Sequence, residues 1–307
     1  MQKRVGLAVC VLVEGLLIPY IVAMMAGEED SIPVSQVAQS GKTVTLQSSG
    51  NRVDAEEYLI GLVAAAIPAD YEMEAVKAQA VMERTYLYKA MDGKDNIEEE
   101  DLSREPWTIK KMEEKWGRSR FQDYYDKIGT AVGETVGMVL TYEGQLIDAL
   151  YHRIGVGKTR SDTSGLCPYL VSRDSLWDLE AEGCLQVRVY SEEEFAAAIN
   201  TINPEAQVAA DQILSTVQAI TKDENGYITL MQIGGYQFSA VQVAEALDVY
   251  STCMTFEEYE GGIRVSAKGI GQGYGVSQYG ANQMAREGKT WEDILKYYYQ
   301  NIAVTSV

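Results

Sequence analysis

The sequence predicts an α+β fold. A single extracytoplasmic domain of short, mainly antiparallel sheets with interleaved helices is expected behind an N-terminal transmembrane helix. Three observations lead to this class. An apolar segment of span length opens the chain. One long helical pattern occupies residues 70–91. Strand-like runs then follow one another through short turns, with helical patterns between the blocks.

Residues 1–26 are interpreted as a membrane anchor. The apolar stretch from Val5 to Ala26 is about 22 residues long, which is enough to cross a bilayer. Lys3 and Arg4 precede it and acidic residues follow at 28–30, so the N-terminus is expected inside and the domain outside, at the cell membrane. A cleaved signal peptide is the competing interpretation, and the length favours an uncleaved anchor.

The composition limits the expected partners. Of the 307 residues 46% are hydrophobic, which is enough for a packed core, and the formal net charge is −19. Nucleic acid is not an expected partner, because it needs a basic footprint, and anionic lipid surfaces are disfavoured. A neutral or zwitterionic ligand such as a glycan is compatible with this charge. Acidity that only keeps the domain soluble is at least as compatible.

The chain is expected to divide into three parts: the anchor, a polar tether at 27–52 and one domain at 53–302. A charged insertion at about 92–127 interrupts this domain and is predicted to carry one amphipathic helix, roughly from Thr108 to Ile128. Its aromatic side chains either stack on a sugar or attach the insertion to its own domain. The second interpretation is favoured.

Other elements follow from local patterns. A short strand is predicted near the end of the tether, from Thr43 to Leu46. Two hairpins are predicted at 136–151 and 227–238, and a strand from Ile263 to Ala267 leads into a glycine-rich motif. Helices are expected in 192–217 and after the second hairpin, from Val241 to Leu247.

The most informative stretch is 56–91. An apolar run from Leu59 is ended by Pro68, and Asp70 is a candidate N-cap for a helix that continues to Met91. A stripe of mostly small residues predicts close packing against another element. Lys77 and Arg84 are seven residues apart on one flank of that stripe. They are either two solvated cations or two cationic donors beside a cleft.

Residues 56–86 resemble a signature of the stage II sporulation protein D family, which includes the amidase enhancer LytB. The resemblance lies in two stretches, EEYLIGLVAA-IPA and EAVKAQAVxxRTY. The stretch GIGQGYGVSQYGANQMAREGKTWEDILKYYYQ at 269–300 resembles the C-terminal signature of that family, and the matches together reach from about Val53 to Ile302. The resemblance implies peptidoglycan glycan strands as ligand. Well-known members are membrane-anchored lytic transglycosylases, and others assist cell-wall amidases. It implies no cofactor.

The sequence departs from the family pattern at two polar positions. Active members carry a glutamate two residues before the motif proline, and Ala66 stands there in this chain. The C-terminal motif of the family usually has a histidine where Gln272 stands. Lytic transglycosylation needs one carboxylic acid with a raised pKa to protonate the glycosidic oxygen. Ala66 cannot do this, so a glycan-binding, amidase-enhancing protein is predicted. An active transglycosylase with another acid and a structural membrane component are the alternatives.

Two other glutamates, Glu83 and Glu74, are candidates for the missing general acid. Glu83 stands where the family normally has a small residue. It points about 140° from the small-residue stripe, which predicts that it faces solvent or another element. Glu74 lies within about 40° of the stripe. However, Lys77 three residues later is expected to depress the pKa of Glu74, the wrong direction for a general acid. Glu74 is therefore a weak substitute.

The glycine motif supplies further candidates. Glycines at alternate positions predict a strand that passes under a bulky ligand or another backbone. The neutral hydrogen-bonding groups of Gln272, Ser277 and Gln278 and the ring of Tyr279 suit acetamido sugars. The resemblance places Lys77 and Arg84 in the same cleft, so all six residues are candidate glycan-binding residues. Alternatively, Ser277 and Gln278 cap a helix that begins near Ala281.

His152 is the only histidine. Tyr151, His152 and Gly157 match a family word, Tyr-His-Ser-Thr-Ser-Gly-Gly, whose small hydroxyl residues are replaced here by residues 153–155, Arg-Ile-Gly. Some members bind zinc through a histidine and two cysteines. The corresponding set would be His152, Cys167 and Cys184, but it lacks the close spacing of structural zinc sites, so no metal is predicted. A disulfide between Cys167 and Cys184 is the expected state outside the cell.

Overall fold

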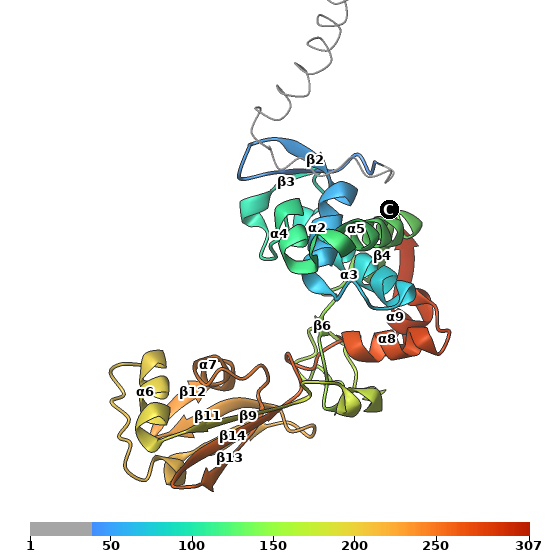
Figure 1. The fold of residues 1–307 in the computed structure, drawn as a ribbon. Helices are drawn as coiled ribbons and strands as arrows, with labels where there is room; N and C mark the ends of the chain where they lie inside the picture. Colours follow the sequence, from blue (N-terminus) through green and yellow to red (C-terminus); the bar gives the residue numbers. More distant parts are fainter. Residues whose placement is uncertain (1–38) are drawn as a thin grey trace, which may run out of the picture.

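The computed structural model describes residues 39–307, so the predicted anchor at 1–26 and the first part of the tether lie outside the described residues. The described chain forms two lobes, each with its own hydrophobic core (Figure 1). The first lobe contains residues 39–182 and 271–307, and the second lobe contains residues 183–270. Within the described chain, no helix has both the length and the apolar character needed to cross a membrane.

The first lobe is mainly helical. Its helices are α2 (Ala55–Ala66), α3 (Met73–Met91), α4 (Ile109–Trp116), α5 (Arg118–Glu134), α8 (Gln278–Arg286) and α9 (Trp291–Tyr298). The Asp54 carboxylate accepts a hydrogen bond from the Glu56 amide and thereby caps α2. Helix α3 packs against α2, α5, α8 and α9, which explains why it buries so many small residues.

Short strands border these helices. One sheet has the order β2 (Arg52–Asp54), β1 (Thr43–Thr45), β3 (Asn96–Glu98), and another has β16 (Ala303–Ser306), β4 (Met138–Tyr142), β5 (Gln145–Leu146). Two pairs complete the lobe: β6 (Tyr151–His152) with β15 (Val276–Ser277), and β7 (Gly157–Lys158) with β8 (Asp174–Ser175). The 3-10 turns are η1 (Glu99–Asp101) and η2 (Leu176–Glu180).

The second lobe has two three-stranded sheets. One has the order β13 (Cys253–Tyr259), β14 (Gly262–Lys268), β9 (Leu185–Tyr190), and the other has β10 (Gln218–Lys222), β11 (Ile228–Ile233), β12 (Tyr236–Ser239). Its helical elements are α6 (Glu192–Ile202), η3 (Ile213–Thr216) and α7 (Ala240–Ala246). Alternate apolar residues of β14 and the residues Met231 and Ile233 of β11 are buried in the core of this lobe. Helices α6 and α7 lie over the sheets in Figure 1.

The α+β class is confirmed, and the strand pairings are antiparallel except β1 with β3 and β15 with β6. The long helix begins at Met73 with Glu72 at its N-cap, so the candidate cap Asp70 lies in the preceding turn instead. The single helix predicted between Thr108 and Ile128 is two helices, α4 and α5, which meet at Gly117. Trp116 packs between neighbouring aromatic rings of this insertion and against the first core, in agreement with the favoured interpretation.

The glycine motif is not the predicted strand. It is an irregular loop in which Gly269, Gly271, Gly273 and Gly275 have positive φ angles. A Cβ on Gly275 would lie 1.8 Å from the Leu150 carbonyl oxygen, so only glycine permits this approach of the two backbones. The close backbone contact that the glycines predicted is present. It brings the C-terminal motif beside the segment that follows residue 149.

Candidate functional site at the junction of the lobes

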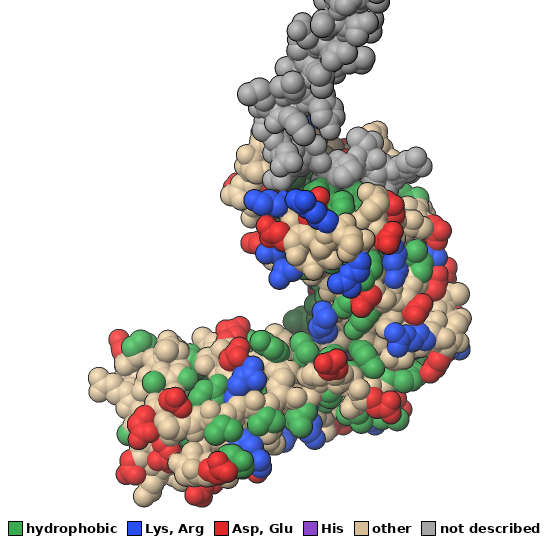
Figure 2. All heavy atoms as spheres, in the orientation of Figure 1, with side chains coloured by type: hydrophobic (Ala, Val, Ile, Leu, Met, Phe, Trp, Pro, Cys, Tyr) green, Lys and Arg blue, Asp and Glu red, His purple; other side chains and the backbone are tan. Residues whose placement is uncertain are grey.

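The two signature stretches meet where the lobes join. Strand β6 lies between the lobes, and the surface is hollowed there (Figures 1 and 2). Parallel pairing of β6 with β15 places Tyr151 opposite Val276 and His152 opposite Ser277. Helix α8 then begins directly after β15 and packs on α3. Residues about 200 positions apart in the sequence therefore form one site.

Ala66 ends α2 at this junction and is half-buried. The Ala66 carbonyl oxygen accepts a hydrogen bond of 2.8 Å from Gln278 Nε2, and the same nitrogen donates to Gln79 Oε1 at 3.0 Å. Gln278 is buried. It thus satisfies one of the carbonyls that a helix end leaves without an intrahelical partner. A residue of the C-terminal signature, Gln278, therefore binds the backbone of Ala66, the position at which the resemblance leads us to expect the catalytic glutamate.

The hydrogen-bonded chain continues into the first lobe. Gln79 Nε2 donates to Glu83 Oε1 at 2.8 Å, and Arg104 Nη1 lies 2.7 Å from Glu83 Oε2. Glu83 is 1% exposed and pairs with Arg104, so of the two expected surroundings, solvent or another element, it faces another element. Burial raises the pKa of neighbouring Tyr151, and the Glu83 charge raises it further. Because both Glu83 oxygens are bonded and shielded from solvent, Glu83 cannot reach a glycan.

Lys77 and Glu74 are bound to each other. Lys77 Nζ lies 2.6 Å from Glu74 Oε1 and 2.7 Å from Glu134 Oε2 on α5. Burial opposes the charge of Lys77, but the hydrogen bonds that its ammonium group donates to Glu134 and Glu74 raise its pKa overall. Glu74 Oε2 also accepts the Trp291 amide at the start of α9. These contacts join three helices, so both candidates have structural partners in place of an open cleft.

Arg84 lies in the interior of the first lobe. Its guanidinium forms a two-point pair with the Glu56 carboxylate at 2.7 and 2.6 Å, and it also donates to the Val132 carbonyl oxygen at 3.0 Å. Both members of the pair are at most 1% exposed. This position leaves Arg84 no atom that a glycan in the junction could contact.

Ser277 is the N-cap of α8, as the alternative interpretation of the motif expected. Its Oγ accepts the Gly280 amide at 3.1 Å and donates to Asp178 Oδ1 at 2.6 Å. Asp178 is fully buried, and burial raises its pKa although hydrogen bonds from Ser277 and Ser175 oppose the shift. Asp178 is not among the site residues that the sequence predicted.

His152 lies behind this cap. Its Nδ1 is 3.0 Å from the Tyr274 carbonyl oxygen and therefore donates to it, which leaves Nε2 as an acceptor. Burial lowers the pKa of His152 to about 4, so the ring is neutral. Within the described chain, His152 Nε2 and Asp178 Oδ2 have no hydrogen-bond partner. A Cβ on Gly155 would lie 3.0 and 2.6 Å from these two atoms, so both border the same small space.

The three thiols of the described residues are free, including the two that were expected to form a disulfide. Cys167 packs on the first core and receives a hydrogen bond from Tyr169 at 3.3 Å, whereas Cys184 lies in a separate cluster with Ile154 and Ala181. These different surroundings keep the sulfurs unbridged. In residues 39–307 no three His, Cys, Asp or Glu side chains are grouped to hold a metal ion, and His152 shares no such group with the thiols.

The accessible part of the junction has a different set of residues. Gln272 is exposed, and Tyr279 is half-buried, with its amide donating to the Arg153 carbonyl oxygen at 3.1 Å. Tyr71, in the turn between α2 and α3, is half-buried as well; burial raises its pKa and the positive charge of Arg153 opposes this. No pattern in the sequence pointed to Tyr71. For Arg153 a signal existed, because it stands where the family carries a small hydroxyl residue.

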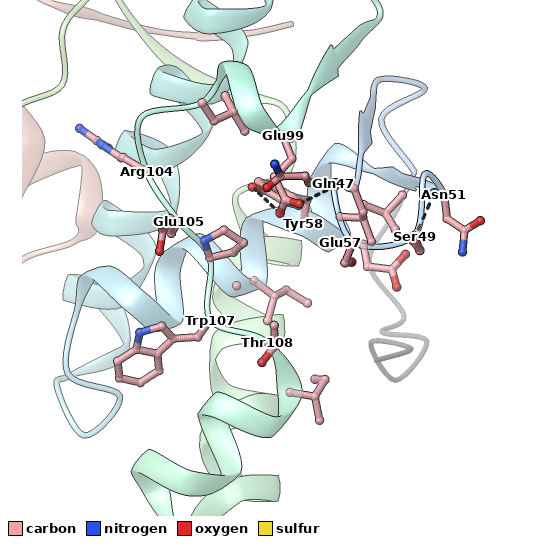
Figure 3. A pocket seen from close by; sticks show the side chains of 18 of the residues that line it. Gln47, Ser49, Asn51, Glu57, Tyr58, Glu99, Arg104, Glu105, Trp107 and Thr108 are labelled. Carbon is pink, nitrogen blue, oxygen red and sulfur yellow. Dashed lines mark hydrogen bonds between the residues drawn. The ribbon is translucent and has the colours of Figure 1, made fainter. Parts of the chain in front are cut away.

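A groove lies elsewhere on the first lobe. Within the described chain it has a volume of about 1320 Å³ and is bordered by the β1–β2 turn, the first half of α2 and residues 99–112 (Figure 3). Glu99 in its wall is already bonded to Tyr58 and to the Gln47 amide. We assign the site to the junction, because the two signature stretches meet there, whereas this groove is lined only by the start of the first one, at residues 57–61, and by no residue of the second.

Comparisons with known proteins agree with this arrangement. Residues 45–142 match the family model described as stage II sporulation protein. Stage II sporulation protein D of Bacillus amyloliquefaciens is 31% identical over 273 residues, which cover 85% of this chain and 77% of that protein. The protein of the same name from Bacillus subtilis (strain 168) is 31% identical over 274 residues, with the same coverage. The amidase enhancer of Bacillus subtilis is 24% identical over 305 residues, covering 81% of this chain and 40% of that protein.

Fold and site together define a two-lobed α+β protein whose two sequence signatures converge on the end of one helix. The identity and coverage of its relatives confirm the resemblance, and the chain belongs to the stage II sporulation protein D family.

Proposed function

We propose that this protein binds peptidoglycan glycan strands without cleaving them and acts in cell-wall remodelling during sporulation by positioning or stimulating a partner amidase. The names of its relatives, stage II sporulation protein D and amidase enhancer, support this role. The protein is held at the cell membrane by residues 1–26, with both lobes on the extracytoplasmic side. Positive residues before the apolar segment and acidic residues after it support this placement.

One observation carries the binding-only part of the proposal. The position of the family acid is Ala66, and the groups around it are the neutral amides of Gln278 and Gln79. Without a carboxylic acid, the leaving-group oxygen of a glycosidic bond has no proton donor. Glu83 and Glu74 do not replace it, because the oxygens of both side chains are held by other groups of the first lobe.

The test scores binding and cleavage separately. The purified protein is incubated with glycan strands, bound strands are measured by co-sedimentation, and anhydro-sugar ends are measured by mass spectrometry. The natural protein is expected to bind strands and release no anhydro product. Substantial anhydro product would replace this proposal with an active enzyme, and absence of glycan binding would leave a structural membrane component.

A substitution sharpens the test. Ala66→Glu is expected to release a small but measurable amount of anhydro product, because a carboxyl group at this half-buried helix end is partly desolvated and its pKa rises. The matched control is Ala65→Glu, which adds the same group to the preceding, equally half-buried residue. Equal product from both variants would show that position 66 has no special geometry.

A further inference from the structure

Arg153 is fixed in the junction by its backbone. It directly follows β6, its amide donates to the Ile270 carbonyl oxygen at 3.1 Å, and its own carbonyl oxygen accepts the Tyr279 amide at 3.1 Å. The residue is exposed. The backbone is thus held between the two lobes while the guanidinium remains accessible to solvent.

The charge of Arg153 has no acidic partner. Three arginines of the first lobe that are buried or half-buried are paired instead: Arg84 with Glu56, Arg104 with Glu83 and Arg160 with Asp223. Within residues 39–307, no carboxylate oxygen lies within 4.0 Å of the Arg153 guanidinium. Arg153 therefore brings an exposed positive charge without an acidic partner, among the described residues, to the junction of a chain whose net charge is −19.

The surroundings of Arg153 are aromatic and polar. Tyr71 and Tyr279, both half-buried, are its neighbours, and the charge of Arg153 acts on the Tyr71 hydroxyl. The charges of Asp70 and Asp178 raise the pKa of the same Tyr71 hydroxyl. Asp70 is exposed in the α2–α3 turn, and Asp178 is buried and bonded to Ser277. Tyrosine rings in the same junction as an exposed guanidinium provide a surface on which a sugar ring can lie while an acidic substituent reaches the charge.

From this geometry we propose that Arg153 is a specificity-determining residue that binds a carboxylate carried by the glycan, so that the site selects acidic glycan strands over neutral ones. The planar guanidinium suits two-point binding of a carboxylate. The carboxylate comes either from the lactyl group of a peptide-free muramic residue or from an attached peptide. This inference rests on the proposed glycan binding and deepens it.

The experiment compares three probes with the full chain: peptide-free glycan strands, peptide-bearing strands and neutral N-acetylglucosamine hexamers. The natural protein is expected to bind at least one acidic strand about tenfold more tightly than the neutral hexamer at low salt, and added salt should reduce this difference. The preferred acidic strand identifies the source of the carboxylate. Equal affinity for acidic and neutral probes overturns the inference and leaves the proposed function intact, whereas binding of none overturns both.

Variants of Arg153 test whether this residue causes the preference for acidic glycan strands. Arg153→Gln should lose the roughly tenfold preference and its salt dependence while binding of the neutral hexamer stays within about twofold. Arg153→Lys should recover only part of it, because an ammonium lacks the two-point geometry. The control is Lys158→Gln, which removes another exposed cation five residues away. If Arg153→Gln weakens acidic and neutral probes equally, or Lys158→Gln has the same effect, the assignment is overturned. Unchanged thermal unfolding verifies that the variants fold.

Discussion

Helix α3 contributes residues to two polar clusters, which differ in whether their hydrogen bonds stay inside the first lobe or reach the site. The Arg84–Glu56 pair is closed, because its partners are buried groups of the first lobe. The chain from Arg104 through Glu83 and Gln79 is open at one end, where Gln278 reaches the backbone of Ala66. A signature motif can therefore combine residues that stabilise the fold with residues that shape the site. Sequence spacing alone does not separate the two groups.

The largest expected effect concerns the closed cluster. Glu56→Ala leaves the Arg84 guanidinium buried without its carboxylate, which should lower the free energy of unfolding by about 3–5 kcal/mol. Denaturant unfolding measures this change. The control is Glu292→Ala, which removes the partner of exposed Lys296 and should cost less than about 1 kcal/mol. A small loss in Glu56→Ala would contradict the view that this pair is a closed structural unit.

Acidic pH should destabilise the region behind the open cluster. The pKa of buried His152 is lowered to about 4 in the fold, compared with 6.5 in the unfolded chain, so the unfolded state binds more protons between these values. Stability should therefore fall as pH decreases from 6.5 towards 4, by up to about 3 kcal/mol. The raised pKa of Asp178 acts in the opposite direction, because a folded state that retains its proton gains stability at low pH.

Thermal and denaturant unfolding at several pH values tests this dependence. His152→Asn removes the titrating ring, so the slope of stability against pH between 6.5 and 4 should become smaller in this variant. An unchanged slope would show that other groups cause the acid sensitivity.

A smaller effect is expected for the open cluster. Gln278→Leu leaves the Ala66 carbonyl and Gln79 Oε1 without their donor, which should cost about 1–3 kcal/mol of unfolding free energy. It should also weaken glycan binding, since the end of α2 loses its link to α8. A double-mutant cycle with Glu83→Gln should give a coupling of about 0.5–3 kcal/mol. If the effects of the two substitutions are additive, Gln278 and Glu83 are not energetically coupled and the proposed chain of hydrogen bonds is contradicted.

The smallest effect concerns the thiols, which belong to neither cluster. Because the sulfurs are free, peptide mapping without reduction should find no peptide that links Cys167 to Cys184. Alkylation of the native protein should modify half-buried Cys167 and Cys253 faster than buried Cys184, with little change in stability. A bridged peptide would restore the disulfide that the extracytoplasmic location suggested.

The sequence by itself determined the family and the α+β class, and it shows alanine at position 66, where the resemblance leads us to expect a glutamate. It also determined elements with strong local signals, such as the hairpin of β11 and β12 and the Ser277 cap of α8, because caps and turns depend on neighbouring residues. Only the tertiary structure decided which charges are used. Lys77 is bound by Glu134 and Glu83 by Arg104, whereas Arg153 has no acidic partner in the part of the chain that the structure describes. Such ion pairs join residues that are distant in the sequence, and the burial that makes a charge structural or functional is a property of the packed chain.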